Sequence, residues 1–221
     1  MPINTEKIGE IKIKLAEMVQ AVVEIFHDSL TSIQNADREL SRDMEDRDDV
    51  IDNLEILLEN KCLSLLALQA PKASELRYVV AVTRLTSDLE RVGDHSSAIT
   101  KSGTNHYLAP LIRSEPDFIT MGEMALKMLK KATDSFFKED VLVHRELLEE
   151  DMEVGNIQKR LTLSLVEKMR KEPDRSLSIV TLINIIRRVE RVADHAKNIA
   201  ALVPYVKDGT MARHERYVKK A

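Results

Sequence analysis

The sequence has 221 residues, of which 33 are Lys or Arg and 37 are Asp or Glu, so its formal net charge is −4. This balance argues against a nucleic-acid-binding protein, which needs a marked excess of positive charge. Only 4% of the residues are aromatic, and six glycines and six prolines are few for the many turns of a β-rich fold. With 43% hydrophobic residues the chain can still form a sizeable core, so we expect an all-α protein.

The first half of the chain predicts three long helices. In each of them apolar residues recur every three or four positions, the spacing that keeps one face of a helix buried. Residues 35–37 form a turn after the first helix, Pro71 ends the second because proline cannot continue the helical hydrogen bonding, and Gly103 closes the third. The three apolar stripes cover residues 8–33, 40–65 and 74–99.

The second half repeats this pattern. Pro173 separates its second and third helices, and Pro204 follows the third. Helices of this length with such stripes favour bundles with shallow crossing angles, so we predict two tandem three-helix bundles. The bundles cover residues 1–105 and 116–205, with a linker over 106–115 and a basic tail over 206–221.

A duplicated motif supports the repeat. The sequence Glu-Arg-Val-Gly-Asp-His at residues 90–95 recurs as Glu-Arg-Val-Ala-Asp-His at residues 190–195, an offset of 100 residues. Both copies lie late in the third predicted helix of their unit. Internal duplication explains this agreement better than chance does.

The motif places two carboxylates on the same helix face in each unit. Glu90 and Asp94 are four residues apart, as are Glu190 and Asp194. Like charges at this spacing destabilise an isolated helix unless a cation compensates them. The cation could be a metal ion, or it could be a nearby arginine in an ordinary ion pair.

The preceding helix of each unit carries further acidic residues. Asp48 and Asp52 form a second carboxylate pair in the first unit, and four oxygen donors from two helices would suit iron(III), manganese, magnesium or calcium. In the second unit Asp151 and its acidic neighbours within residues 149–153 offer the same chemistry, but Gly155 stands where Asp52 would have its counterpart. The second site is therefore the less complete of the two.

These motifs resemble those of the PhoU family, whose members are cytoplasmic regulators of phosphate uptake. The resemblance rests on residues 90–94, on residues 190–199, and on residues 71–77, which lead into the third helix. It extends from the first helix to about Tyr205.

By this resemblance the chain would form a pair of three-helix bundles, often assembled as a dimer, with multinuclear metal clusters. Iron is the first expectation for the metal, with zinc, manganese or magnesium as alternatives. The implied partners are the ATPase of the phosphate-specific ABC transporter and a phosphate sensor histidine kinase, which the chain would restrain when phosphate is plentiful. The implied metal ligands are Glu90, Asp94, Asp48 and Asp52 in the first unit and Glu190, Asp194 and Asp151 in the second.

Three histidines could add to such a site. His95 and His195 directly follow the predicted ligand aspartates but are turned by about 100° around the helix, which favours a hydrogen-bonding role over direct ligation. Glu24 and His27 form the ExxH fragment of ferritin-like di-iron helices, but such sites need a second copy, which this sequence lacks. We expect His27 to be a surface histidine.

Three other functions stay open at this point. A metalloenzyme, either a di-iron oxidase or a metal-dependent phosphatase, could use the same carboxylates, but the sequence shows no clear general base for it. A purely structural bundle with ion-paired faces would need no metal. A PhoU-like protein could also serve a different transporter. We expect a metal-binding adaptor that is not an enzyme.

The sequence indicates a cytoplasmic protein without membrane insertion. It contains no run of about 18 apolar residues, and its start lacks the apolar segment of a secretory signal. The single cysteine, Cys62, cannot form an internal disulfide and lies on an apolar stripe, so we expect it in the core.

Overall fold

The computed structural model describes residues 2–103 and 108–210, with side chains from residue 6 onward. All regular secondary structure in these ranges is helical, as predicted. The long helices are α1 (Pro2–Asn35), α3 (Met44–Gln69), α4 (Ala73–Gly103), α6 (Pro116–Lys138), α7 (Val143–Lys171) and α8 (Ser176–Ala200). The short ones are α2 (Arg38–Arg42), α5 (Leu108–Arg113), α9 (Val203–Asp208) and the 3₁₀ helix η1 (Pro173–Arg175).

The first unit consists of α1, α3 and α4, which pack against one another. The predicted turn after α1 is confirmed: Ala36 has a positive φ of 55°, and the Asp37 carboxylate accepts hydrogen bonds from two backbone N–H groups of α2. Asp43 separates α2 from α3, so the predicted second helix is in fact two helices. Cys62 is fully buried in this core, as predicted.

The second unit consists of α6, α7 and α8, packed in the same way. The predicted apolar stripes of α7 and α8 are buried along their length. At two helix starts the predicted stripe is wrong: Phe118 is buried in place of Ile119, and Leu76 is 42% exposed, with Val79 as the first buried residue of α4. Near the end of a bundle fewer neighbouring helices cover each turn, so an apolar residue there is not always enclosed.

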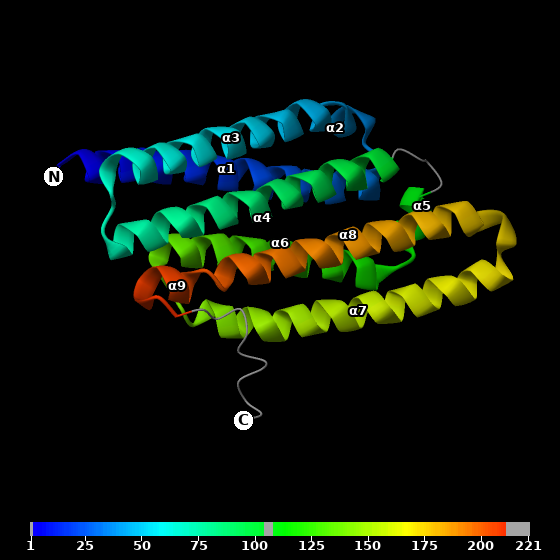
Figure 1. Ribbon diagram of the computed structural model, residues 1–221. Coiled ribbons are helices and arrows are strands. Elements are labelled where there is room, and N and C mark those ends of the chain that lie inside the picture. The colour runs from blue at the N-terminus through cyan, green and yellow to red at the C-terminus, as the bar shows by residue number, and fades with distance from the viewer. Residues whose placement is uncertain (1, 104–107, 211–221) are drawn as a thin grey trace, which may run out of the picture.

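The two units form one molecule with two layers of helices (Figure 1). One layer contains α3, α4, α8 and α7 in that spatial order, and the other contains α1 and α6, which also contact each other. The central helices α4 and α8 run antiparallel, since α9 at the end of α8 packs against the start of α4, where Arg77 Nε donates to Val206 O. Because these helices are antiparallel, equivalent residues of the two repeats meet only near the middle of the contact, as His95 and His195 do.

Part of the predicted linker is helical. Residues 108–113 form α5, which packs on α8, α1 and α6, and Leu108, Leu111 and Ile112 are buried. Pro110 does not prevent this helix because it lies in the first turn, where its missing N–H group would have no helical acceptor. Most of the predicted basic tail, residues 211–221, lies outside the described residues.

No helix in the described parts of the chain combines the length and the hydrophobicity needed to cross a membrane.

Candidate metal centre and the contact between the repeats

The duplicated motifs lie on the central helices α4 and α8, in the second half of each. Glu90 and Asp94 of α4 lie near Asp48 and Asp52 of α3, the helix that precedes and packs against α4. We use the name first groove for these four residues at the contact between the two helices. Residues of α8 and α7 form the corresponding second groove: Glu190, Asp194 and Asp151.

The first groove concentrates negative charge that nearby cations only partly offset. Burial raises the pKa of Asp48, and the carboxylates of Asp52 and Asp94 raise it further against the opposing effects of Ser97 and Lys101. Burial and the nearby Asp94 carboxylate also raise the pKa of Glu90. These shifts show that burial, and to a lesser extent the neighbouring carboxylates, disfavour the ionised forms of Asp48 and Glu90.

A fifth acidic residue of this groove, Glu55, was missed by the sequence analysis. Burial raises its pKa, as do the carboxylates of Glu59 and Asp52. A signal for it existed, because Asp48, Asp52, Glu55 and Glu59 follow one another at steps of three or four residues and therefore share a face of α3.

Arginine contributes to this groove only at its solvent edge. Arg91 Nε lies 3.4 Å from Glu90 Oε2, and Arg91 Nη1 lies 3.2 Å from Asp94 Oδ2, but the Arg91 side chain is 59% exposed. Exposed pairs of this kind stabilise little. The carboxylates do not converge tightly either: in the two described ranges no group of three or more His, Cys, Asp or Glu is placed to hold a metal ion. The metal ligands of the first groove thus stay a prediction.

The second groove contains its own cation. Lys197 Nζ donates to Asp151 Oδ2 at 2.6 Å and to Asp194 Oδ1 at 2.5 Å, and so connects α7 with α8. Burial lowers the pKa of Lys197, but its contacts with the two carboxylates outweigh this effect and raise the pKa above its ordinary value. Glu190 lies close by, with a pKa raised by burial and by both aspartates.

The acidic neighbours of Asp151 do not strengthen the second groove. Glu150 accepts a hydrogen bond from Lys131 Nζ of α6 at 2.7 Å, and Glu153 pairs with Arg160 within α7 at 3.9 Å. At Gly155, where the first repeat has Asp52, an ideal Cβ would meet no atom within 4 Å, so this position supplies no ligand and leaves open space.

The two grooves therefore differ in their fit to a metal ion. The first gathers five acidic side chains of the type that hard cations prefer, although no three of them are placed to hold a metal ion in the described structure. In the second, the Lys197 ammonium contacts an oxygen of each aspartate, so these residues do not fit a metal as they stand. The predicted ligands Glu190, Asp194 and Asp151 are brought together, but around a lysine.

The two repeats meet through the histidines of the duplicated motifs. The rings of His95 and His195 lie 5.7 Å apart between centroids, and His195 Nδ1 lies 2.8 Å from Asp88 Oδ1 of α4. Burial lowers the pKa of His95 to about 4, and His195, Arg188 and Arg191 add to the effect, so this ring is neutral. Both histidines thus lie between α4 and α8. The contact with Asp88 agrees with the expected hydrogen-bonding role of His195, whereas His95 Nδ1 is buried without a hydrogen-bond partner among the described residues.

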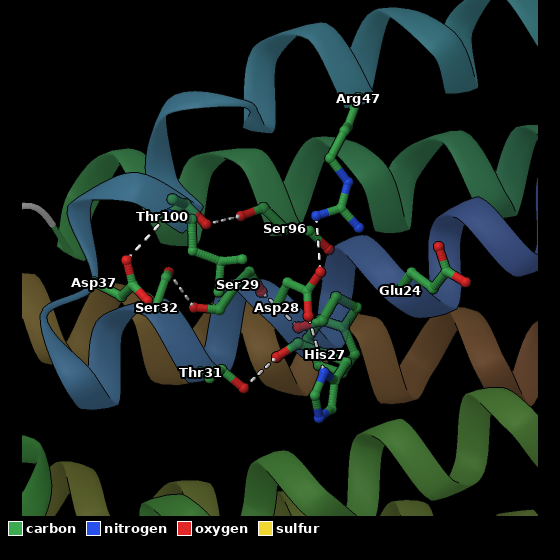
Figure 2. A network of polar contacts seen from close by, with 12 residues as sticks. Glu24, His27, Asp28, Ser29, Thr31, Ser32, Asp37, Arg47, Ser96 and Thr100 are labelled. Atoms are coloured by element: carbon green, nitrogen blue, oxygen red, sulfur yellow. Dashed lines mark hydrogen bonds and ion pairs between the residues drawn. The ribbon is translucent and has the colours of Figure 1, made fainter.

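The ExxH fragment on α1 forms no metal site. Figure 2 shows the Glu24 carboxylate and the His27 ring pointing apart. Glu24 accepts a hydrogen bond from Gln20, and His27 Nδ1 lies 3.0 Å from Asp28 Oδ1, with Asp28 also paired to Arg47 of α3 at 2.8 Å. The His27 side chain is 58% exposed, which confirms the predicted surface histidine.

The PhoU domain model matches this chain twice, over residues 15–102 and residues 118–203. These two matches cover most of the chain. The chain belongs to the PhoU family. Its two PhoU domains coincide with the two bundles, the first ending in α4 and the second ending with α8 and the start of α9.

Relatives of similar length share this PhoU architecture. The chain is 28% identical to the phosphate-specific transport system accessory protein PhoU homolog of Pseudomonas aeruginosa, over 94% of this chain and 86% of that protein. It is 29% identical to the protein of the same name from Aquifex aeolicus, over 97% and 96%. The crystal structure of PhoU from Pseudomonas aeruginosa matches with a TM-score of 0.85 and 26% identity, over 93% of this chain and 99% of that chain.

A second solved structure also matches this fold. The phosphate transport system regulatory protein PhoU from Streptococcus pneumoniae matches with a TM-score of 0.85 at 25% identity, over 94% of this chain and 98% of that chain. The all-α fold of paired PhoU domains, predicted from the duplicated motif, is thereby confirmed.

Proposed function

We propose that this chain is a regulatory accessory protein of phosphate-specific transport and not an enzyme. The observation that carries the proposal is its match, over nearly the whole of both chains, to relatives named as accessory proteins of that transport system. In this role the chain restrains the transporter ATPase and the phosphate sensor histidine kinase when phosphate is plentiful.

A metal ion in the first groove is the second part of the proposal. Glu90 and Asp94 of α4 would hold it together with Asp48 and Asp52 of α3, and the raised pKa values of Asp48 and Glu90 support a cation there. When bound, the metal neutralises these charges and ties the two helices together. Iron is the first candidate, with manganese, magnesium or zinc as alternatives.

Fixing α3 to α4 would also act on the rest of the molecule. The helix α4 contributes both to the first groove and to the central contact with α8, where Asp88 meets His195. An ordered groove therefore presents a rigid four-helix face to a partner, because the layer α3, α4, α8 and α7 is continuous (Figure 1).

We also propose that the chain forms a homodimer. The helix α3 exposes several large apolar side chains, among them Ile56 and Leu63, which are seven residues apart and share one face. Exposed apolar surface of this kind favours contact with another protein. Light scattering of the purified chain would give twice the monomer mass, and Ile56→Glu with Leu63→Glu would reduce the mass to that of the monomer.

The function is tested in a bacterial host that lacks its own accessory gene. The chain is expressed there in ample phosphate, and phosphate uptake and a phosphate-starvation reporter are measured. We expect the wild-type chain to lower both signals, and Glu90→Gln with Asp94→Asn to lose this effect. The control is Glu123→Gln with Asp134→Asn, two acidic residues on α6 outside both grooves.

Two results would contradict the proposal. A stably expressed wild-type chain that changes neither signal, in a host where a known accessory protein restores them, argues against the regulatory role. Turnover of a phosphoester or consumption of oxygen by the iron-loaded protein would instead favour the enzyme alternatives.

A further inference from the structure

Lys197 occupies the point at which a cation would join α7 to α8. Its ammonium nitrogen lies 2.6 Å from an oxygen of Asp151 on α7 and 2.5 Å from an oxygen of Asp194 on α8. Only 20% of the Lys197 side chain and 14% of the Asp151 side chain are exposed. A salt bridge this enclosed differs from the solvated pairs on the protein's surface, because water competes less with it.

The first repeat has no lysine at this point. The duplicated motifs align position 197 with position 97, and position 97 is a serine. Ser97 brings a hydroxyl close to Asp48 but no charge. The second repeat therefore has a largely enclosed ammonium between its two helices, whereas the arginine beside Glu90 and Asp94 in the first repeat, Arg91, is 59% exposed.

A second difference points in the same direction. The second repeat has Gly155 where the first has Asp52, so the groove with the lysine also has one carboxylate fewer. A single ammonium with three N–H donors suits two aspartates, whereas a metal cluster needs more oxygen donors. Loss of the ligand and gain of the lysine are complementary changes.

We propose that Lys197 is the permanent internal cation of the second groove, where it replaces a metal ion and makes the second repeat independent of metal. The two repeats have thereby specialised: the second holds α7 to α8 by a lysine, and the first is left as the metal-responsive one. Only this last contrast rests on the proposed metal binding of the first groove.

The test compares metal uptake by the wild type and by two variants that remove the lysine charge. Lys197→Ser copies the first repeat, and Lys197→Gln keeps most of the side-chain volume in case the serine variant folds poorly. Metal-free protein is dialysed against Mn²⁺, a hard cation suited to carboxylates, and the bound ion is counted. Lys197→Arg is the matched control because it preserves the charge.

We expect either neutral variant to bind about one more Mn²⁺ per chain than the wild type, since a multivalent cation replaces the ammonium between the two aspartates. Adding Asp151→Asn should abolish this gain, and Lys197→Arg should show none. The expected result includes unchanged metal content for Asp151→Asn alone, because the second groove of the wild type holds no metal.

The proposal is overturned if neither neutral variant gains an ion, or if Asp151→Asn alone lowers the metal content of the wild type. Failure of the first groove to bind metal is a separate result. If the wild type binds no Mn²⁺ but Lys197→Ser does, the role of Lys197 stands and the proposed metal site at Glu90 and Asp94 fails.

Discussion

At the scale of single residues, the two grooves show how one side chain decides the electrostatics of a site. Glu90 and Asp94 have the same spacing as Glu190 and Asp194, yet only the second pair has a partly buried ammonium beside it, from Lys197. The first pair instead repels its neighbours on α3. Removing one of these charges should therefore stabilise the metal-free protein and destabilise the metal-loaded protein.

The variant Glu90→Gln tests these opposite effects on stability. In chelated protein it should raise the free energy of unfolding by about 0.2–0.5 kcal/mol, the scale of a like-charge pair at this helical spacing. In metal-loaded protein it should lower the stability, because it removes a ligand. Thermal melting with and without a chelator measures both. A loss of stability in the chelated protein would show that the groove is not repulsive.

A second prediction at this scale concerns the effect of His95 on the pH dependence of stability. Its pKa of about 4 in the folded protein is below the ordinary 6.5, so the unfolded chain binds more protons between these values. Stability must then fall as the pH falls through this window, by about 2 kcal/mol from pH 7 to pH 5 for this residue. The groups around it are Asp94 of α4 and His195, Arg188 and Arg191 of α8.

Denaturant unfolding of His95→Gln at the two pH values measures this contribution. The wild type should lose more stability than the variant on acidification, and the exposed His27→Gln should behave like the wild type. Carboxylates with raised pKa, such as Asp48 and Glu90, act in the opposite direction, since protonation removes a partly buried charge and also relieves repulsion between carboxylates. They are present in every variant, so equal losses in wild type and His95→Gln would contradict the prediction.

The sequence could reveal the carboxylates but not their surroundings. The spacing of Glu90 and Asp94 already places both on one helix face. Lys197 was not recognised because a lysine on an amphipathic helix usually faces solvent, and only the packing of α7 on α8 brings Asp151 within reach of it. Glu55 was missed for a similar reason, since its burial depends on the neighbouring helix.

At the scale of the helices, two glycines differ in how closely neighbouring atoms pack against them. An ideal Cβ on Gly103, the last residue of α4, would lie 1.9 Å from Ile33 Cγ2 on α1, whereas one on Gly155 in α7 meets nothing within 4 Å. Gly103 therefore permits the close approach of two helices. Gly155 has no such packing role, and its main effect is to increase the conformational entropy of the unfolded chain.

Alanine at these two positions should have opposite effects. Gly155→Ala should raise the free energy of unfolding by about 0.5–1 kcal/mol through helix propensity alone. Gly103→Ala should lower it by about 1–3 kcal/mol because the added methyl group forces α1 and α4 apart. Chemical denaturation measures both, and a stabilising Gly103→Ala would contradict the observed packing.

Helix existence was more predictable than helix ends. The six long stripes follow directly from the spacing of apolar residues, and Pro71 marks the end of α3 as expected. The short helix α5 was not predicted because Pro110 suggested a linker, although Leu108, Leu111 and Ile112 already had helical spacing. The break at Asp43 has no comparable signal in the apolar pattern.

At the scale of the whole molecule, the central contact between α4 and α8 makes the two domains one unit. Asp88 and His195 join the helices that also carry the two grooves. The helix α4 therefore belongs both to the first groove and to the contact between the domains, within the layer formed by α3, α4, α8 and α7 (Figure 1).

Removing metal with a chelator should measure how much a bound metal stabilises the folded molecule. A ligand at 100 times its dissociation constant stabilises the folded state by about 2.7 kcal/mol, which corresponds to a fall in melting temperature of about 5–10 °C when it is removed. We expect such a fall for the wild type and none for Glu90→Gln with Asp94→Asn. An unchanged melting temperature in the wild type would mean that no tightly bound metal stabilises the fold.

If the chain is an accessory protein of phosphate-specific transport, as we propose, it should bind a component of that system, and titration calorimetry against the transporter ATPase from the same organism measures this binding. We predict saturable binding by the metal-loaded chain, weakened at least about tenfold, or by about 1.4 kcal/mol, after chelation or in Glu90→Gln with Asp94→Asn. Absence of binding to the ATPase and to the phosphate sensor kinase, with both partners shown to be folded, would contradict the account.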